Sequence, residues 1–134
     1  FYNFEHTKEY LATTKEDSPL IVQIFGNEPQ IIAQALSRLK DMGYKYFDLN
    51  AGCPVKKVTK TGAGAGLLKD ISTLTAILEV MAKVAGEENI GVKIRLGWNK
   101  DDPVYLKIAR VAEELGLGWI TLHPRYAKEG FSGK

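Results

Sequence analysis

Four short apolar segments alternate along the chain with three longer stretches in which apolar residues recur at helical spacing. The short segments are residues 20–25, 46–50, 90–96 and 119–123. Short apolar runs are typical of buried strands, and the longer periodic stretches are typical of amphipathic helices. The pattern therefore predicts the order β-α-β-α-β-α-β, after a less regular lead-in over residues 1–19.

Each predicted helix is bounded by residues that start and stop helices. The starts are Asn27 with Pro29, Asp70, and Asp102 with Pro103, and the stops are Gly43, Gly86 and Gly116. Asn and Asp side chains accept hydrogen bonds from the first backbone N–H groups of a helix, and proline suits its first turn. Glycine adopts the left-handed conformation in which many helices end.

Strands that alternate with helices form parallel sheets with right-handed crossovers, so the chain is predicted to be an α/β protein. Two architectures fit: a doubly wound open sheet, and part of a (β/α)₈ TIM barrel. A complete barrel needs about 250 residues, so 134 residues provide about half of one. The one long irregular stretch, residues 51–69, follows a strand, as active-site loops often do.

Polar residues interrupt the predicted strands at alternate positions, although buried parallel strands are usually apolar throughout. These residues are Gln23, Asp48, Asn50, Lys93, Arg95, Thr121 and His123. Because strand side chains alternate between faces, each strand has one apolar face and one face that is polar toward its C-terminal end. Ligand sites of α/β folds lie at that end. The pattern predicts a site for a large polar ligand with negative character; the alternative is a structural polar network inside a barrel.

The composition is that of an ordinary globular domain. Hydrophobic residues make up 45% of the chain, and 18 basic residues nearly balance 16 acidic ones, which argues for neither nucleic acid nor a membrane surface. No apolar run reaches the roughly 20 residues that span a bilayer. Cys53 is the single cysteine, so no intrachain disulfide can form. We expect a cytoplasmic protein with no metal site.

Five segments together resemble the tRNA-dihydrouridine synthase family. They are residues 22–26 (VQIFG), 48–58 (DLNAGCPVKKV), 62–70 (GAGAGLLKD), 92–98 (VKIRLGW) and 123–125 (HPR). The resemblance implies an FMN-binding (β/α)₈ barrel, of which residues 1–134 form a partial domain with strands three to six. The remaining strands and a C-terminal helical domain would lie outside the chain, so this part is expected to be inactive by itself. Pro124 stands where many members have glycine.

The resemblance also implies a reaction, the reduction of specific uridines in tRNA to 5,6-dihydrouridine. Reduced FMN gives a hydride to uracil C6, and NADPH regenerates the reduced flavin. Cys53, in the position matching the family's acid, would give a proton to C5. An ordinary thiol is mostly protonated at neutral pH, so this assignment is chemically reasonable.

The same resemblance assigns the rest of the site. Gln23, Lys93 and His123 would contact FMN, and a lysine near the flavin stabilises its anionic reduced form. Asn50 and Arg95 would lie near the flavin or the target uracil. Arg125 is a further candidate for contact with flavin or RNA.

The loop at residues 51–69 carries glycines and lysines. Its glycines, Gly62, Gly64 and Gly66, lack the spacing of a dinucleotide-binding fingerprint, and we expect a flexible active-site loop instead. Its lysines are Lys56, Lys57, Lys60 and Lys69. Beside an active site, Lys56, Lys57 and Lys60 would contact tRNA phosphates.

Two other functions stay open from the sequence. The first is a relative of dihydroorotate dehydrogenase, which also acts on a pyrimidine C5–C6 bond with flavin and lysine. The second is a non-catalytic RNA-binding scaffold on a decayed barrel. In either case half a barrel leaves unpaired strand edges, so the chain is expected to self-associate through them.

Overall fold

The computed structural model describes residues 9, 11–14 and 16–130, so most of the irregular lead-in lies outside the described residues. Its four strands are β1 (Ile21–Ile24), β2 (Tyr46–Ala51), β3 (Ile90–Arg95) and β4 (Trp119–His123). They pair in parallel in the order β1-β2-β3-β4. The predicted alternation and the parallel α/β sheet are therefore confirmed.

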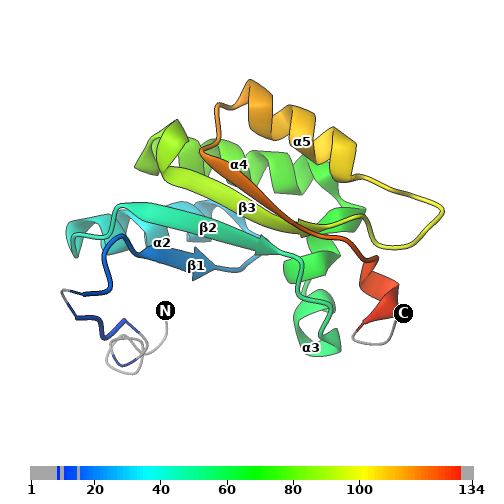
Figure 1. Cartoon of the computed structure of the whole chain (residues 1–134), viewed down its shortest axis with the longest axis horizontal. Helices are drawn as coiled ribbons and strands as arrows, with labels where there is room; N and C mark the ends of the chain where they lie inside the picture. The colour runs from blue at the N-terminus through cyan, green and yellow to red at the C-terminus, as the bar shows by residue number, and fades with distance from the viewer. Residues whose placement is uncertain (1–8, 10, 15, 131–134) are drawn as a thin grey trace.

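The three long helices of the described residues lie on one face of this sheet (Figure 1). The three long ones are α2 (Pro29–Asp41), α4 (Ile71–Ala85) and α5 (Tyr105–Glu114), and the short ones are α3 (Lys56–Thr59), η1 (Gly64–Lys69), η2 (Glu87–Asn89) and η3 (Ala127–Glu129). A doubly wound sheet reverses its strand order and carries helices on both faces. Consecutive strand order with helices on one face is the arrangement of a partial (β/α)₈ barrel.

The expected cap at Asp70 and the three glycines expected after the helices agree with the structure, whereas the start expected at Asp102 is wrong, because α5 begins at Tyr105 with Val104 as its N-cap residue. Asp70 caps α4 by accepting a hydrogen bond from the Thr73 backbone N–H at 3.0 Å. Gly43 follows α2 with φ of +97°, a conformation that favours glycine. The expected cap at Asn27 is wrong, because Glu28 is the N-cap residue of α2 and the Asn27 amide donates to the Thr61 carbonyl. Asn27 thereby joins the start of α2 to the loop after β2.

The hydrophobic core lies between the sheet and α4. Leu74, Ile77, Leu78 and Met81 of α4 are fully buried against residues of β2 and β3. Long apolar side chains at this spacing form one continuous stripe along the helix, which is why α4 packs flat on the two central strands. The core therefore holds these two strands in place.

The outer strands are less buried than the sequence suggested. We expected residues 20–25 to form a buried strand, but Ile21 is 49% exposed and β1 lies at the edge of the described sheet. On β4 the apolar residues Ile120 and Leu122 are 39% and 43% exposed. Apolar composition predicted the strands correctly but could not predict which ones have neighbours on both sides.

Candidate functional site

The predicted polar residues lie on one face of the sheet, opposite the helices, in three rows that cross the strands. The register gives the rows Gln23–Asp48–Gly91–Trp119, then Asn50–Lys93–Thr121, then Arg95–His123. Because directly paired residues of neighbouring strands point to the same face, each row places its side chains side by side. The rows approach the C-terminal ends of the strands, where α3 and η3 extend beyond the sheet (Figure 1).

Cys53 lies two residues beyond the end of β2 and is a half-buried free thiol. The side-chain oxygen of Asn50 accepts hydrogen bonds from the backbone N–H groups of Gly52 and Cys53, at 3.1 and 3.0 Å. The carbonyl of Cys53 accepts a hydrogen bond from the Ala65 N–H at 2.9 Å. The backbone on both sides of the thiol is therefore held by the strand and by η1.

The glycine run forms part of this support rather than the expected flexible loop. Gly64, Ala65 and Gly66 are buried in η1. Gly64 has φ of +57°, and a Cβ atom there would stand 2.8 Å from the carbonyl oxygen of Cys53. Glycine at this position thus permits a close approach to the Cys53 backbone that a larger residue would prevent.

Arg95 is buried and its guanidinium binds backbone carbonyls. Its Nε donates to Gly52 O at 2.8 Å, and its Nη1 lies 3.3 Å from Tyr126 O and 3.2 Å from Gly130 O. Burial and the charge of Arg125 lower the pKa of the Arg95 guanidinium. Arg95 therefore joins the loop before Cys53 to the loop after β4, and its expected contact with flavin or uracil stays a prediction.

His123 carries the one buried polar side-chain atom, Nδ1, that finds no hydrogen-bond partner among the described residues. Its pKa is lowered, first by burial and then by the positive charges of Arg95, Arg125 and Lys93. A neutral imidazole has one donor and one acceptor nitrogen, so His123 can bind a polar ligand through either type of bond. The three neighbouring cations make this end of the sheet electropositive.

Two residues of the network were missed as site candidates. The Asp48 carboxylate accepts from Gln23 Nε2 at 2.7 Å and from Trp119 Nε1 at 3.0 Å, and Gln23 Oε1 accepts from Asn50 Nδ2 at 2.9 Å. Asp48 stood out in the sequence as a carboxylate inside a buried strand. Trp119 gave no such signal, because only the register places its indole over Gly91 and within reach of β2.

The lysines of the loop fall into two groups. Lys56, Lys57 and Lys60 are exposed on and just after α3, beyond the strand ends. Lys69 is placed differently, since its ammonium lies 4.3 Å from the centre of the Trp98 ring. Arg125 is half-buried near Arg95 and His123. Of the four loop lysines, Lys56, Lys57 and Lys60 are therefore the ones placed to contact a negatively charged ligand lying across α3.

Residues 9, 11–14 and 16–130 contain no group of three or more His, Cys, Asp or Glu side chains arranged to hold a metal ion. In the same part of the chain, no helix has the length and apolar character needed to cross a membrane.

Comparison with known proteins gives consistent matches along the chain. The family described as Dihydrouridine synthase (Dus) matches residues 2–134. The tRNA-dihydrouridine synthase B of Pseudomonas aeruginosa is 32% identical over 133 residues, which cover 99% of this chain and 40% of that protein. A probable tRNA-dihydrouridine synthase of Treponema pallidum is 31% identical, over 96% of this chain and 39% of that protein. The chain thus spans about two fifths of the length of these relatives.

Proposed function

The chain belongs to the dihydrouridine synthase family, and we propose on this basis that its polar sheet face reduces uridines in tRNA to 5,6-dihydrouridine. The observation that carries the proposal is the position of Cys53, held at the end of a buried strand close to Arg95, which is one of the cations around His123. A thiol that donates a proton needs a fixed place close to a bound ring. The two hydrogen bonds to Asn50 support such a place.

The residues present fit FMN, the cofactor expected for this family. The Nδ1 atom of His123 is buried and has no hydrogen-bond partner among the described residues, and a polar ligand edge would satisfy it. Lys93 stands beside Asn50 in the middle row and supplies a positive charge. Gln23 still has one amide hydrogen and one lone pair after its bonds to Asp48 and Asn50. These three residues would hold the flavin, which supplies the hydride when it has been reduced by NADPH.

Cys53 acts in this proposal as the general acid at uracil C5. Its proton leaves the thiol as the new C–H bond forms, and solvent returns a proton before the next turnover. The target base must leave its stack to enter the site. The loop that carries Cys53 is held from two sides, by Asn50 and by Arg95 through Gly52 O, which limits how far the thiol can move from the base.

The test uses the protein that contains this chain, reduced with NADPH without oxygen and mixed with unmodified tRNA or with orotate. We expect tRNA to reoxidise the flavin and orotate to leave it reduced. Reoxidation by orotate alone would move the assignment to a relative of dihydroorotate dehydrogenase. A protein that carries no flavin and still retains tRNA would be an RNA-binding scaffold, and either result contradicts the proposal.

Lys56, Lys57 and Lys60 are proposed to bind tRNA phosphates beside the site. They are exposed on and next to α3, which continues directly from the Cys53 loop. Each lost phosphate contact should reduce the slope of log affinity against log salt by about 0.7 to 0.9. Replacing all three by alanine should therefore flatten the slope by about 2 to 3. Lys107→Ala, an exposed lysine on α5, is the matched control and should leave the slope unchanged.

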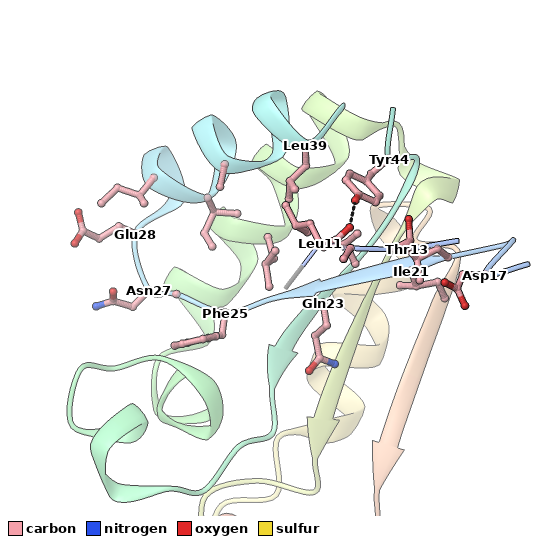
Figure 2. Close-up of a pocket in the computed structure, with 18 residues that line it drawn as sticks. Leu11, Thr13, Asp17, Ile21, Gln23, Phe25, Asn27, Glu28, Leu39 and Tyr44 are labelled. Atoms are coloured by element: carbon pink, nitrogen blue, oxygen red, sulfur yellow. Dashed lines mark hydrogen bonds between the residues drawn. The ribbon is translucent and has the colours of Figure 1, made fainter. Parts of the chain in front are cut away.

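We further propose that two copies of the chain associate through their sheet edges. A groove of about 780 Å³ runs beside β1 on its α2 side, bordered by Leu11, Ile21, Phe25 and Tyr44 (Figure 2). Phe25 and Ile31 along it are 63% and 51% exposed. The β4 edge of a second copy is suited to it, because Leu122 and the α5 residue Leu106 are also exposed. Two four-stranded sheets joined in this way provide the eight strands of a barrel.

Sedimentation velocity of residues 1–134 at micromolar concentration tests the association. We expect a dimer that Phe25→Glu and Leu122→Glu each dissociate. Lys83→Glu also introduces a negative charge, but at an exposed position of α4, and should leave the dimer intact. A monodisperse monomer of the unchanged chain would contradict the proposal. The cytoplasmic location and the assignment of residues 1–134 to one partial barrel domain stay predictions.

A further inference from the structure

Asp48 begins a chain of hydrogen bonds that ends at Cys53. Its side chain is 6% exposed and accepts from Trp119 Nε1 on one oxygen and from Gln23 Nε2 on the other. The indole reaches it across β3 because the residue between them in the row is Gly91, where a Cβ atom would stand 2.0 Å from Trp119 Nε1. An indole N–H can only donate, so Asp48 must present an acceptor to it.

The bonds that follow have a direction. A side-chain amide has one donor end and one acceptor end. Because Gln23 Nε2 faces the carboxylate, its Oε1 faces Asn50 and accepts from Asn50 Nδ2 at 2.9 Å. The oxygen of Asn50 then faces the loop, where it accepts from the N–H groups of Gly52 and Cys53. Each amide can satisfy both of its neighbours in one orientation only.

We propose that Asp48 is a positioning residue that sets the orientation of the Gln23 and Asn50 amides and so holds the Cys53 backbone in place. The inference deepens the proposed function, since Cys53 is its acid, but it concerns the hydrogen bonds alone. Asp48 itself lies a row below Asn50 and reaches Cys53 only through Gln23 and Asn50.

Asp48→Asn should reverse the donor and acceptor ends of every hydrogen bond between position 48 and Asn50. The oxygen of the new amide must still face Trp119, so its nitrogen faces Gln23. The Gln23 amide then turns to offer its oxygen, and its nitrogen faces Asn50. Asn50 turns in response, and its nitrogen faces the N–H groups of Gly52 and Cys53, which lose their acceptor.

A second substitution should restore the original orientation of the Asn50 amide. In the double variant Asp48→Asn with Gln23→Glu, the side chain at position 23 is a carboxylate and accepts from both sides. It takes one bond from the amide at position 48 and one from Asn50 Nδ2. The oxygen of Asn50 is then free to face Gly52 and Cys53 again. A purely packing role for Asp48 predicts no such rescue.

The test is residue-resolved hydrogen exchange of the Gly52 and Cys53 amides in the 134-residue chain. Loss of one hydrogen bond should accelerate exchange about tenfold in Asp48→Asn. We expect the double variant to return to within about twofold of the unchanged chain, while the amides of Leu36 and Leu78 in the core exchange equally in all three. The inference fails if Asp48→Asn leaves both amides unchanged, or if the double variant exchanges as fast as the single one. It would stand even if tRNA were not the substrate, since the measurement involves neither flavin nor RNA.

Discussion

The two central strands and the two outer strands share the same alternation of apolar and polar residues but differ in burial. Phe47, Leu49 and Ile90, on β2 and β3, are fully buried. Ile120 and Leu122 on β4, which lie on the same face of the sheet, are 39% and 43% exposed. Alternation therefore reports which face a residue occupies, whereas burial depends on whether a neighbour covers that face.

The difference matters because the candidate site draws on both kinds of strand. Cys53, Asn50 and Lys93 belong to the central strands or follow them, while Gln23 and His123 belong to the outer ones. The rows of hydrogen-bonded side chains join the two regions, from Gln23 on β1 to Trp119 on β4 through Asp48. The stable centre thus holds Cys53, the proposed acid, and the edge strands carry two of the expected cofactor contacts.

The largest effect is expected from truncating a central side chain. Phe47→Ala should lower the free energy of unfolding by about 3–5 kcal/mol, because it empties a fully buried position. Leu122→Ala, on the same face of the edge strand β4, should cost about 1 kcal/mol, because 43% of that residue is already exposed to water. Urea unfolding measures both values, at protein concentrations too low for the chain to self-associate. Equal costs would mean that burial does not distinguish the two regions.

A smaller loss is expected where the centre meets the edge. Gly91→Ala puts a methyl group on the Trp119 indole, with the nearest atoms 2.0–2.3 Å away, and should cost about 1–3 kcal/mol. The strain should disappear when Gly91→Ala is made in a Trp119→Leu background. If the cost persists there, the clash is not with the indole.

The smallest effect is expected on the free energy of unfolding as the pH is lowered. Burial and three nearby cations hold the pKa of His123 below its ordinary value in the folded chain. The unfolded chain therefore binds more protons, so stability is retained above pH 6.5 and falls as the pH drops from there toward the folded pKa. His123→Gln should flatten this part of the profile of unfolding free energy against pH. An unchanged profile would show that the imidazole titrates normally.

Much of this arrangement could be predicted from the sequence, and the remainder depended on contacts between distant residues. Alternation was enough to place Gln23, Asn50, Lys93 and His123 on one face, and Asp70 was recognisable as a helix cap. The bond from Trp119 to Asp48 joins residues 71 positions apart and depends on a glycine in the strand between them. No local pattern encodes such a register.

The same limit explains the two loop predictions that failed. The glycine run resembles a flexible loop when read alone, yet η1 is buried because its backbone packs against the Cys53 carbonyl. Asn27 is a good capping residue by type, but the Thr61 carbonyl takes its amide hydrogen. In both cases a tertiary partner in residues 51–69 competes successfully with the local preference.

The most direct test of the account is the single-turnover rate of dihydrouridine formation in the protein that contains this chain, compared with its Cys53→Ala variant. The account predicts that NADPH reduces the flavin equally fast in both, while uridine reduction slows by about 10²–10⁴-fold in the variant, as expected for loss of a general acid. Uridine reduction at an unchanged rate would contradict the role of Cys53.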